Sequence, residues 1–423
     1  MLTDLQLILT LFFILHFFSE RIFAFLTKSR ILSFKANIPP EVKGLMSMEK
    51  WEECSEYNLD KLKFGKWTDV FSLIYLPFIL IVVFPLFYNS TFVSENPGTW
   101  QSAAYASCFL SFTQIPFWLI DWFRQFGIET KYGFNTNTQK NWISDKLKEF
   151  ILSLLLMWIL FSIILISYSW GAKIFANFWW VLAFFLYFSL QVLLMILWPK
   201  LILPLFNKLT PLEDDELRKK LFDLSESAGF KAKSIDVIDG SRRTRHSNAF
   251  FTGFGKFRRI VLFDTLLDQM DHDEVSAVLA HEIGHYRLGH IPKRMFLSFV
   301  LGISFFAFIG FVCSSSLFYN QLMLNHHNYG EIGPILIAFA LAGSVLSYWF
   351  KPLSSFISRK SEFEADAFAV ENVGGWASLS RALRKLYVEN LNYPLPHPLV
   401  SSLFYSHPSL LERERAMKLT SLN

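Results

Sequence analysis

Residues 275–290 read VSAVLAHEIGHYRLGH and set three histidines and a glutamate in a helical pattern, within a chain that is otherwise strongly apolar. Residues 281–285 form an H-E-x-x-H sequence. Positions i and i+4 share one face of a helix, so both imidazoles can reach one metal ion. Asp271 and Glu274 predict a capping box at the start of this helix.

The H-E-x-x-H pattern is typical of zinc hydrolases. We predict His281 and His285 as zinc ligands and Glu282 as the catalytic group, because Glu282 lies about 100° around the helix, beside the ion rather than on it. From there its carboxylate can take a proton from the water that zinc activates and pass it to a leaving amine. The alternative is a helix whose histidines are surface groups without a metal, and the capped context beside an apolar helix argues against it.

A catalytic zinc ion needs a third protein ligand and an open coordination position. His290 lies nine residues after His281 rather than the ten of the H-E-x-x-H-x-x-G-x-x-H pattern, and Leu288 replaces the glycine of that pattern. That pattern is therefore excluded. Glu331 would lie across the membrane from the motif in the topology derived below. A carboxylate from a later helix on the same side remains as the solution.

Such carboxylates occur in residues 358–367, SRKSEFEADA. Glu362 and Asp366 are spaced i, i+4 and share a helix face, whereas Glu364 points elsewhere. We predict Glu362 as the third zinc ligand and Asp366 as the acid that orients a ligand histidine through its other ring nitrogen. Spacing alone leaves open an exposed acidic helix paired with its basic neighbours.

The composition places the chain in the membrane class. Of its 423 residues, 52% are hydrophobic, 17% are aromatic and 18% are charged. The net charge of +4 is small and no basic tract is interleaved with aromatic residues, so we expect no nucleic-acid partner. The three cysteines are far apart, and we expect small buried hydrophobic side chains rather than a disulfide or metal ligands.

Seven apolar stretches approach the roughly 20 residues that are needed to cross a bilayer. The first follows Asp4 and lacks a small-residue cleavage site, so we interpret it as a retained membrane helix rather than a signal peptide. The third is interrupted by Pro116 and Asp121. The predicted spans are 5–27, 70–88, 102–122, 150–169, 177–198, 296–318 and 333–350.

The distribution of Lys and Arg between the loops predicts the orientation. Residues 89–100 and 319–333 carry neither, whereas the loops at the other ends of the spans are basic. The positive-inside rule therefore puts the N-terminus outside and residues 200–295 and 351–423 in the cytosol.

We predict a mainly α integral membrane protein in four segments. Within the second, hydrophobic patterning indicates a helix at 212–229 and strands at 233–238 and 259–263. The segments are 1–199 (membrane helices one to five with cytosolic loops), 200–295 (a cytosolic α+β insert with the H-E-x-x-H helix), 296–350 (membrane helices six and seven) and 351–423 (a cytosolic helical tail with the third ligand).

HEIGHYRLGH, followed much later by SRKSEFEADAFA, resembles the type I CAAX prenyl endopeptidase family, which are integral membrane zinc metalloproteases. Three further blocks resemble that family, and EYNLDKLKF at 56–64 is a weaker match, so the similarity spans nearly the whole chain. The resemblance implies a ring of seven membrane helices around a large water-filled chamber, closed by a cytosolic zinc protease domain. The blocks are IETKYGFNTNT (128–138), RHSNAFFTGFGKFRRIVLFDTLL (245–267) and FYSHPSLLER (404–413).

The resemblance also implies roles for single residues. It places the third zinc ligand at Glu362 and the supporting catalytic acid at Asp366, in agreement with the choice from spacing. Arg413 resembles the arginine that ties the tail helix to the acid cluster.

Two further roles come from the resemblance alone. Asn248, with Ala249 and Phe250, resembles the strand that pairs with the substrate backbone beside the zinc ion. His407 resembles a catalytic histidine that stabilises the developing oxyanion. From the residues themselves, Asn248 would be a loop residue and His407, which precedes a proline, a turn residue.

The predicted function is that of a membrane-embedded zinc endopeptidase with one Zn²⁺ per chain, which removes the C-terminal tripeptide of isoprenylated CAAX proteins. Its expected partners are a lipidated peptide or protein substrate and the lipid bilayer. The zinc domain would face the cytosol, in the endoplasmic reticulum of a eukaryote or in the cytoplasmic membrane of a bacterium.

Two alternatives stay open. One is a protease of the same fold that degrades membrane proteins for quality control, without a prenyl requirement. The other is a transporter or receptor with a structural zinc ion, although the sequence shows no repeated halves with broken helices.

Overall fold

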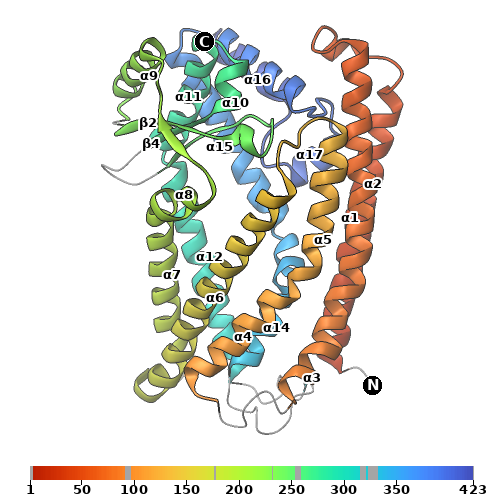
Figure 1. The fold of residues 1–423 in the computed structure, drawn as a ribbon, viewed down its shortest axis with the longest axis vertical. Helices are drawn as coiled ribbons and strands as arrows, with labels where there is room; N and C mark the ends of the chain where they lie inside the picture. The colour runs from red at the N-terminus through yellow and green to blue at the C-terminus, as the bar shows by residue number, and fades with distance from the viewer. Residues whose placement is uncertain are drawn as a thin grey trace.

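Long helices and a smaller mixed domain occupy opposite ends of the protein. In the computed structural model the helices fill the lower part of the view, with the N-terminus at their far end, and the mixed domain covers their upper end, near the C-terminus (Figure 1). The structure describes residues 3–90, 97–175, 178–230, 232–252, 259–314, 321–322 and 332–422.

Among the described residues, six helical segments are long and apolar enough to cross a membrane, and a bent pair of helices gives a seventh. These agree with the seven spans predicted from hydropathy, except that residue 177 of the fifth and residues 315–318 of the sixth lie outside the described part of the chain. The segments are α1 (Asp4–Phe34), α2 (Met48–Phe78) continuing into α3 (Phe84–Tyr88), α4 (Thr99–Thr113) with α5 (Ile115–Phe123), α6 (Gln139–Phe175), α7 (Trp179–Leu197), α12 (His290–Cys313) and α14 (Gly333–Tyr348).

Two spans are broken, and prolines mark both breaks. The third span divides into α4 and α5, and Pro116 lies in the first turn of α5, where its missing N–H has no helical partner to lose. The last span bends by 57° into α15 (Lys351–Asn372), which begins with Pro352. The bend carries the acidic residues of α15 out of the span and into the mixed domain.

The membrane helices form a closed ring. Neighbours along the ring are α1 with α2, α4 with α6, α6 with α7, α7 with α12, and α14 with α1. The Tyr75 hydroxyl donates to the Thr113 carbonyl at 3.0 Å and joins α2 to α4. Phe305 and Phe339, with ring centroids 6.0 Å apart, join α12 to α14.

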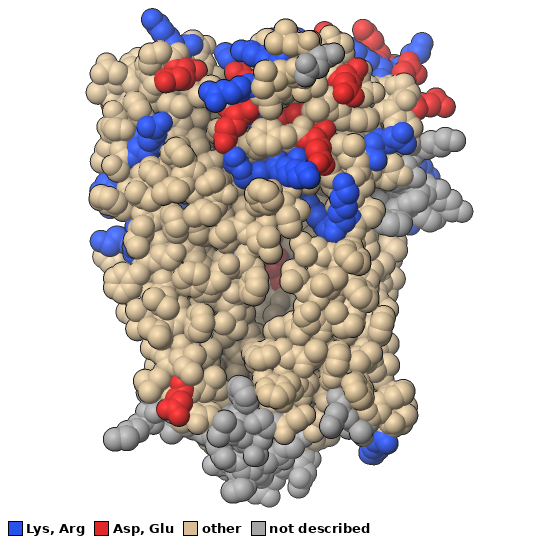
Figure 2. Space-filling model, turned by 180° about the vertical axis from the view of Figure 1, so that it is seen from behind, with Lys and Arg blue, Asp and Glu red and all other residues tan. Residues whose placement is uncertain are grey.

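The space-filling view shows a hollow in the wall of this ring (Figure 2). The wall opens between side chains at mid-height, and the surrounding band is almost free of charge, whereas Lys, Arg, Asp and Glu gather above it (Figure 2). The ring and its hollow confirm the predicted arrangement of membrane helices around a chamber.

The mixed domain is built on a four-stranded sheet of order β1-β2-β4-β3, in which β2 and β4 are parallel and the outer pairs antiparallel. β2 (Ser234–Ile238), β4 (Arg259–Phe263) and the helix α9 (Asp215–Ser227) lie where patterning predicted them. The edge strands β1 (Leu209–Pro211) and β3 (Ala249–Thr252) are too short to show an alternation of apolar and polar residues, so patterning did not predict them.

Helices pack on both the sheet and one another to complete the domain. Leu279 and Ile283 of α11 are buried with Leu262 of β4, and each such side chain contributes about 1.5–3 kcal/mol. This packing fixes the face of α11 that carries the motif. The remaining helices are α8 (Leu203–Phe206), α10 (Asp264–Gln269), α11 (His272–Arg287), α16 (Ala377–Glu389), α17 (Pro398–Phe404) and α18 (Leu410–Thr420).

Candidate active site

The helix α11 begins with the predicted capping box. Glu274 N donates to Asp271 Oδ1 at 2.9 Å, and Asp271 N donates to Glu274 Oε2 at 3.0 Å. Two of the donors at the helix start are thereby satisfied, which is worth about 1 kcal/mol. The helix ends at Arg287, and Gly289, with a φ of 69°, then reverses the chain into α12 at His290.

A glycine lets the two ligand-bearing helices approach closely. A Cβ atom on Gly284 would lie 3.1 Å from both the Cα and the carbonyl oxygen of Ala365, tighter than ordinary contact. Because Gly284 precedes His285 and Ala365 precedes Asp366, this contact holds α11 against α15 at the level of the predicted ligands.

The structure brings His281, His285 and Glu362 together as one group, whose potential ligand atoms lie within 4.8 Å of one another. Glu362 Oε2 is 3.4 Å from His281 Nε2, and Glu362 Oε1 is 3.3 Å from His285 Nε2. Glu362 Oε2 is buried and has no hydrogen-bond partner within the described residues. A buried carboxylate that converges with two imidazole nitrogens suits a cation, and two imidazoles with one carboxylate suit zinc.

The electrostatics of the group also favour positive charge. Burial by itself would lower the pKa of His281, but the nearby carboxylates of Asp366 and Glu362 outweigh it and raise that pKa to about 9. The same two carboxylates would compensate the charge of a bound cation.

The second ring nitrogen of His281 faces a buried ion pair. Asp366 Oδ1 is 2.9 Å from His281 Nδ1, so Nε2 is left to face the metal group. Arg413, from α18, donates to both oxygens of Asp366, at 2.8 and 2.6 Å. Asp366 and Arg413 therefore lie where the sequence and the resemblance put them, and they link α11, α15 and α18.

The second ring nitrogen of His285 faces a different chain of partners, which sequence reasoning missed. His285 Nδ1 is 2.9 Å from His290 Nδ1, and His290 Nε2 is 2.9 Å from Glu364 Oε2. Glu364 is not part of the metal group, as expected from its spacing, but it contacts the site indirectly, because the left-handed turn at Gly289 folds His290 back between His285 and Glu364. The sequence does carry a signal for this contact, because the polar residue His290 directly follows Gly289. Glu331, weighed as a ligand from sequence, lies outside the described residues.

The group opens into a cavity of about 600 Å³ that also contains Glu282, Asn248 and His407. Burial raises the pKa of the Glu282 carboxyl, while the neighbouring His281 and His285 oppose this rise. A carboxylate of raised basicity beside a cation site is suited to accept a proton.

The cavity is bordered by an edge strand. Ala249 and Phe250 belong to β3, the last strand in the order of the described sheet. The N–H of Ala249 contacts the side-chain oxygen of Asn248 at 2.8 Å. An edge strand offers unpaired backbone groups on its outer side, where an extended peptide can add as a further strand.

His407 approaches the metal group from the loop between α17 and α18. Its Nε2 lies 3.5 Å from Glu362 Oε1, and its side chain is 63% exposed. Partial desolvation in the cavity, assisted by the nearby Arg413, lowers the pKa of His407. The predicted site residues therefore meet around this cavity, although they come from four separate stretches of chain: Asp366 lies behind His281, and the others line the cavity.

The fold and the site together define a class: a multi-pass membrane protein with a metallopeptidase domain at one end of its helical ring. Two family models match the chain. The model described as peptidase family M48 matches residues 211–421, and the model described as CAAX prenyl protease N-terminal, five membrane helices, matches residues 28–208.

Individual relatives agree with the family models. The chain is 34% identical to CAAX prenyl protease 1 of Saccharomyces cerevisiae, over 92% of this chain and 90% of the relative. It is 30% identical to the CAAX prenyl protease 1 homolog of Homo sapiens, over 92% and 90%. The crystal structure of S. mikatae Ste24p superposes with a TM-score of 0.86 at 32% identity, covering 98% of this chain and 99% of that one. The chain belongs to peptidase family M48, among the CAAX prenyl proteases, and is a metalloendopeptidase acting on peptide or protein substrates.

Proposed function

We propose that this protein is a zinc endopeptidase that removes the C-terminal tripeptide of isoprenylated CAAX proteins, with one Zn²⁺ per chain held by His281, His285 and Glu362. The observation that carries the zinc assignment is the buried Glu362 carboxylate, whose Oε2 has no hydrogen-bond partner in the described chain and lies 3.4 Å from His281 Nε2, while its Oε1 lies 3.3 Å from His285 Nε2. The substrate assignment is supported by the names of the relatives.

Zinc would supply Lewis acidity, which polarises the scissile carbonyl and makes water a nucleophile near neutral pH. The chain's own groups do the rest. β3, with Asn248, Ala249 and Phe250, aligns the peptide backbone along the cavity. Glu282 takes a proton from the attacking water and delivers it to the leaving nitrogen.

His407 donates a hydrogen bond from Nε2 to the oxygen that becomes negative during attack, and this stabilises the transition state more than the ground state. Asp366 holds the Nδ1 proton of His281, and Arg413 keeps Asp366 ionised and in place. Both act through His281 and Glu362 rather than on the substrate.

The proposal includes the membrane setting. The segments 200–295 and 351–423 lie together at the end of the ring opposite the N-terminus, as the predicted topology requires of two cytosolic regions. We place them in the cytosol, with the N-terminus outside, in the endoplasmic reticulum of a eukaryote or the cytoplasmic membrane of a bacterium.

The test uses a farnesylated CAAX peptide and the same peptide without the lipid. Wild type and Glu282→Gln would be purified full length, their zinc content measured, and cleavage of both peptides followed by mass spectrometry. Glu371→Gln, an exposed site on α15, is the matched control for loss of one carboxylate. We expect equal zinc content in all three proteins and cleavage by wild type and the control but not by Glu282→Gln.

The two parts of the proposal fail separately. If zinc-loaded Glu282→Gln cuts at the wild-type rate, the assigned chemistry is wrong. If wild type cuts the plain peptide as fast as the farnesylated one, the chemistry stands and the prenyl requirement falls, which favours a broader role in membrane-protein quality control.

A further inference from the structure

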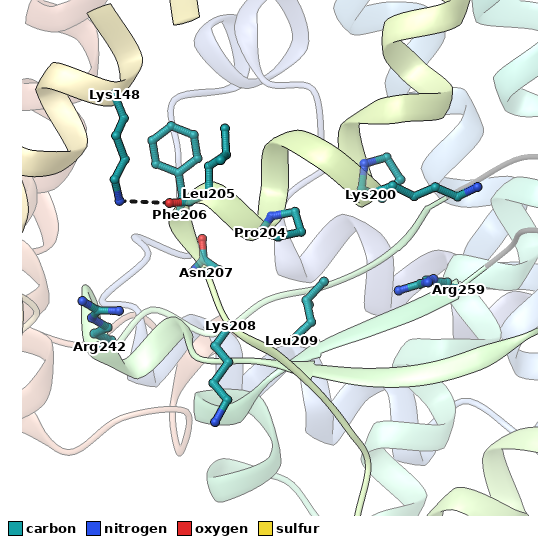
Figure 3. A pocket seen from close by; sticks show the side chains of 11 residues that line it. Lys148, Lys200, Pro204, Leu205, Phe206, Asn207, Lys208, Leu209, Arg242 and Arg259 are labelled. Carbon is teal, nitrogen blue, oxygen red and sulfur yellow. Dashed lines mark hydrogen bonds between the residues drawn. The ribbon is translucent and has the colours of Figure 1, made fainter. Parts of the chain in front are cut away.

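A second cavity, of about 530 Å³, lies where the membrane helices meet the mixed domain. Its lining is strongly basic, and none of its described lining residues is acidic. In the close view, Lys148 and Arg242 stand on one side and Lys200 and Arg259 on the other, with Pro204 and Asn207 between them (Figure 3). A fifth cation, Lys208, lies at its edge.

The cations of this basic pocket come from both parts of the protein. Lys148 is on α6 and Lys200 is in a π-helical turn (Trp198–Ile202) after α7, whereas Arg242 and Arg259 belong to the mixed domain. Two of them have carboxylates at long range: Arg259 is 3.4 Å from Asp236, and Lys148 is 3.6 Å from Asp145.

Asp145 is in any case engaged elsewhere. Its carboxylate oxygens accept hydrogen bonds from Nε of Arg243 at 2.8 Å and from Nη2 of Arg243 at 3.2 Å. Positive charge therefore exceeds negative charge around the cavity, which suits an anion.

An apolar groove of about 580 Å³ adjoins the basic pocket and shares Phe206 and Asn207 with it. One side of the groove is formed by Leu152, Leu156 and Met157 of α6. The other side is formed by Trp198, in the turn after α7, and Leu203, the first residue of α8. Its one acid among the described lining residues, Glu149, is 2.8 Å from Lys146.

The groove lies along apolar spans, and the basic pocket lies at their end. The α7 span continues as an apolar helix to Phe206, and Trp198, Leu201 and Leu205 in its last part are each at least half exposed. Exposed Trp and Leu beside Lys are typical of the level at which acyl chains give way to headgroups.

We propose that the basic pocket and the apolar groove together bind an anionic glycerophospholipid. Its phosphate lies among Lys148, Lys200, Arg242 and Arg259, and an acyl chain lies along α6 in the groove. Basic pockets between membrane helices recognise anionic headgroups in this way. Because the four cations belong to two parts of the protein, the bound lipid braces the mixed domain against α6 and α7.

The test measures lipid binding to the full-length protein in non-ionic detergent by native mass spectrometry, with phosphatidylglycerol and phosphatidylcholine of identical acyl chains. The double variant Lys200→Gln/Arg259→Gln removes one cation from each part. Lys219→Gln/Arg415→Gln removes the same charge at two exposed sites outside the pocket. A third protein, Lys200→Arg/Arg259→Lys, keeps the charge and controls for folding.

We expect wild type to prefer phosphatidylglycerol, and the Gln double variant to lose roughly 10- to 30-fold in affinity for it. The surface control and the charge-keeping variant would stay within about twofold of wild type. Equal binding of the two lipids by wild type, an equal loss in the surface control, or a loss in the folded charge-keeping variant would each overturn the proposal.

Two further measurements distinguish the lipid from other possible ligands of the cavity. Leu156→Trp fills the groove and should weaken phosphatidylglycerol binding, while soluble glycerol phosphate should compete poorly. If glycerol phosphate competes as well as the lipid, the pocket binds a free phosphate and the lipid assignment is wrong. If the farnesylated peptide displaces the lipid one for one, the cavity is a substrate site and the assignment is equally wrong.

Discussion

Replacing His290 would test whether the chain of side chains behind His285 sets the affinity for metal. His290 is 2% exposed, and its Nδ1 lies 2.9 Å from His285 Nδ1. When His285 presents Nε2 to an ion, its Nδ1 carries a proton, so His290 is the acceptor and donates in turn from Nε2 to Glu364. His290→Ala would leave the proton on His285 without its partner.

The size of the effect follows from this geometry. A buried donor left without an acceptor costs about 1–3 kcal/mol, and loss of a partner behind a metal ligand typically costs about 10–100-fold in metal affinity. We expect the zinc dissociation constant of His290→Ala to rise within that range. Glu364→Ala should act in the same direction but more weakly, because Glu364 is one hydrogen bond further from His285 than His290 is, and its side chain is 37% exposed.

The assay is zinc exchange to a chromogenic chelator, at several chelator concentrations, with the full-length protein in detergent. His290→Gln keeps a side-chain acceptor and should recover part of the affinity, which a purely structural role for the ring would not allow. His272→Ala is the control, because His272 begins the same helix and its partner, Asp214 at 2.9 Å, lies outside the site. A zinc affinity of folded His290→Ala within twofold of wild type would refute this account of His285.

Three other substitutions test the site. Arg413→Met leaves the 1% exposed Asp366 without its cation and should lower the free energy of unfolding by about 3–5 kcal/mol, read from chemical denaturation with zinc present. Gly284→Val puts a side chain 3.1 Å from the Ala365 backbone, so it should separate α11 from α15 and reduce zinc content measured by atomic emission, whereas Gly127→Val, at a glycine with open space around it, should not. His407→Ala should lower kcat by about 100-fold with zinc content unchanged, and an unchanged kcat would remove His407 from the mechanism.

The features that sequence predicted correctly are those written in local patterns. Apolar runs near the length of a bilayer indicated the membrane spans, and Pro116 marked one of the two that break. The spacing of the H-E-x-x-H motif placed His281 and His285 on one face of α11, and Asp271 with Glu274 marked its start. In each case the relevant partners lie within one or two helical turns, where periodicity and capping chemistry act.

The features that were missed depend on contacts between distant segments. The sequence did not show that Glu364 contacts His290, because the left-handed turn at Gly289, 75 residues earlier in the chain, places that partner. Likewise, spacing could pair Glu362 with Asp366 but could not bring them to α11; the bend of 57° after α14 and the missing side chain at Gly284 do that. A single sequence indicates which side chains can bind a metal. The residues that hydrogen-bond to those ligands and orient them are brought there by helix packing, which depends on the whole fold.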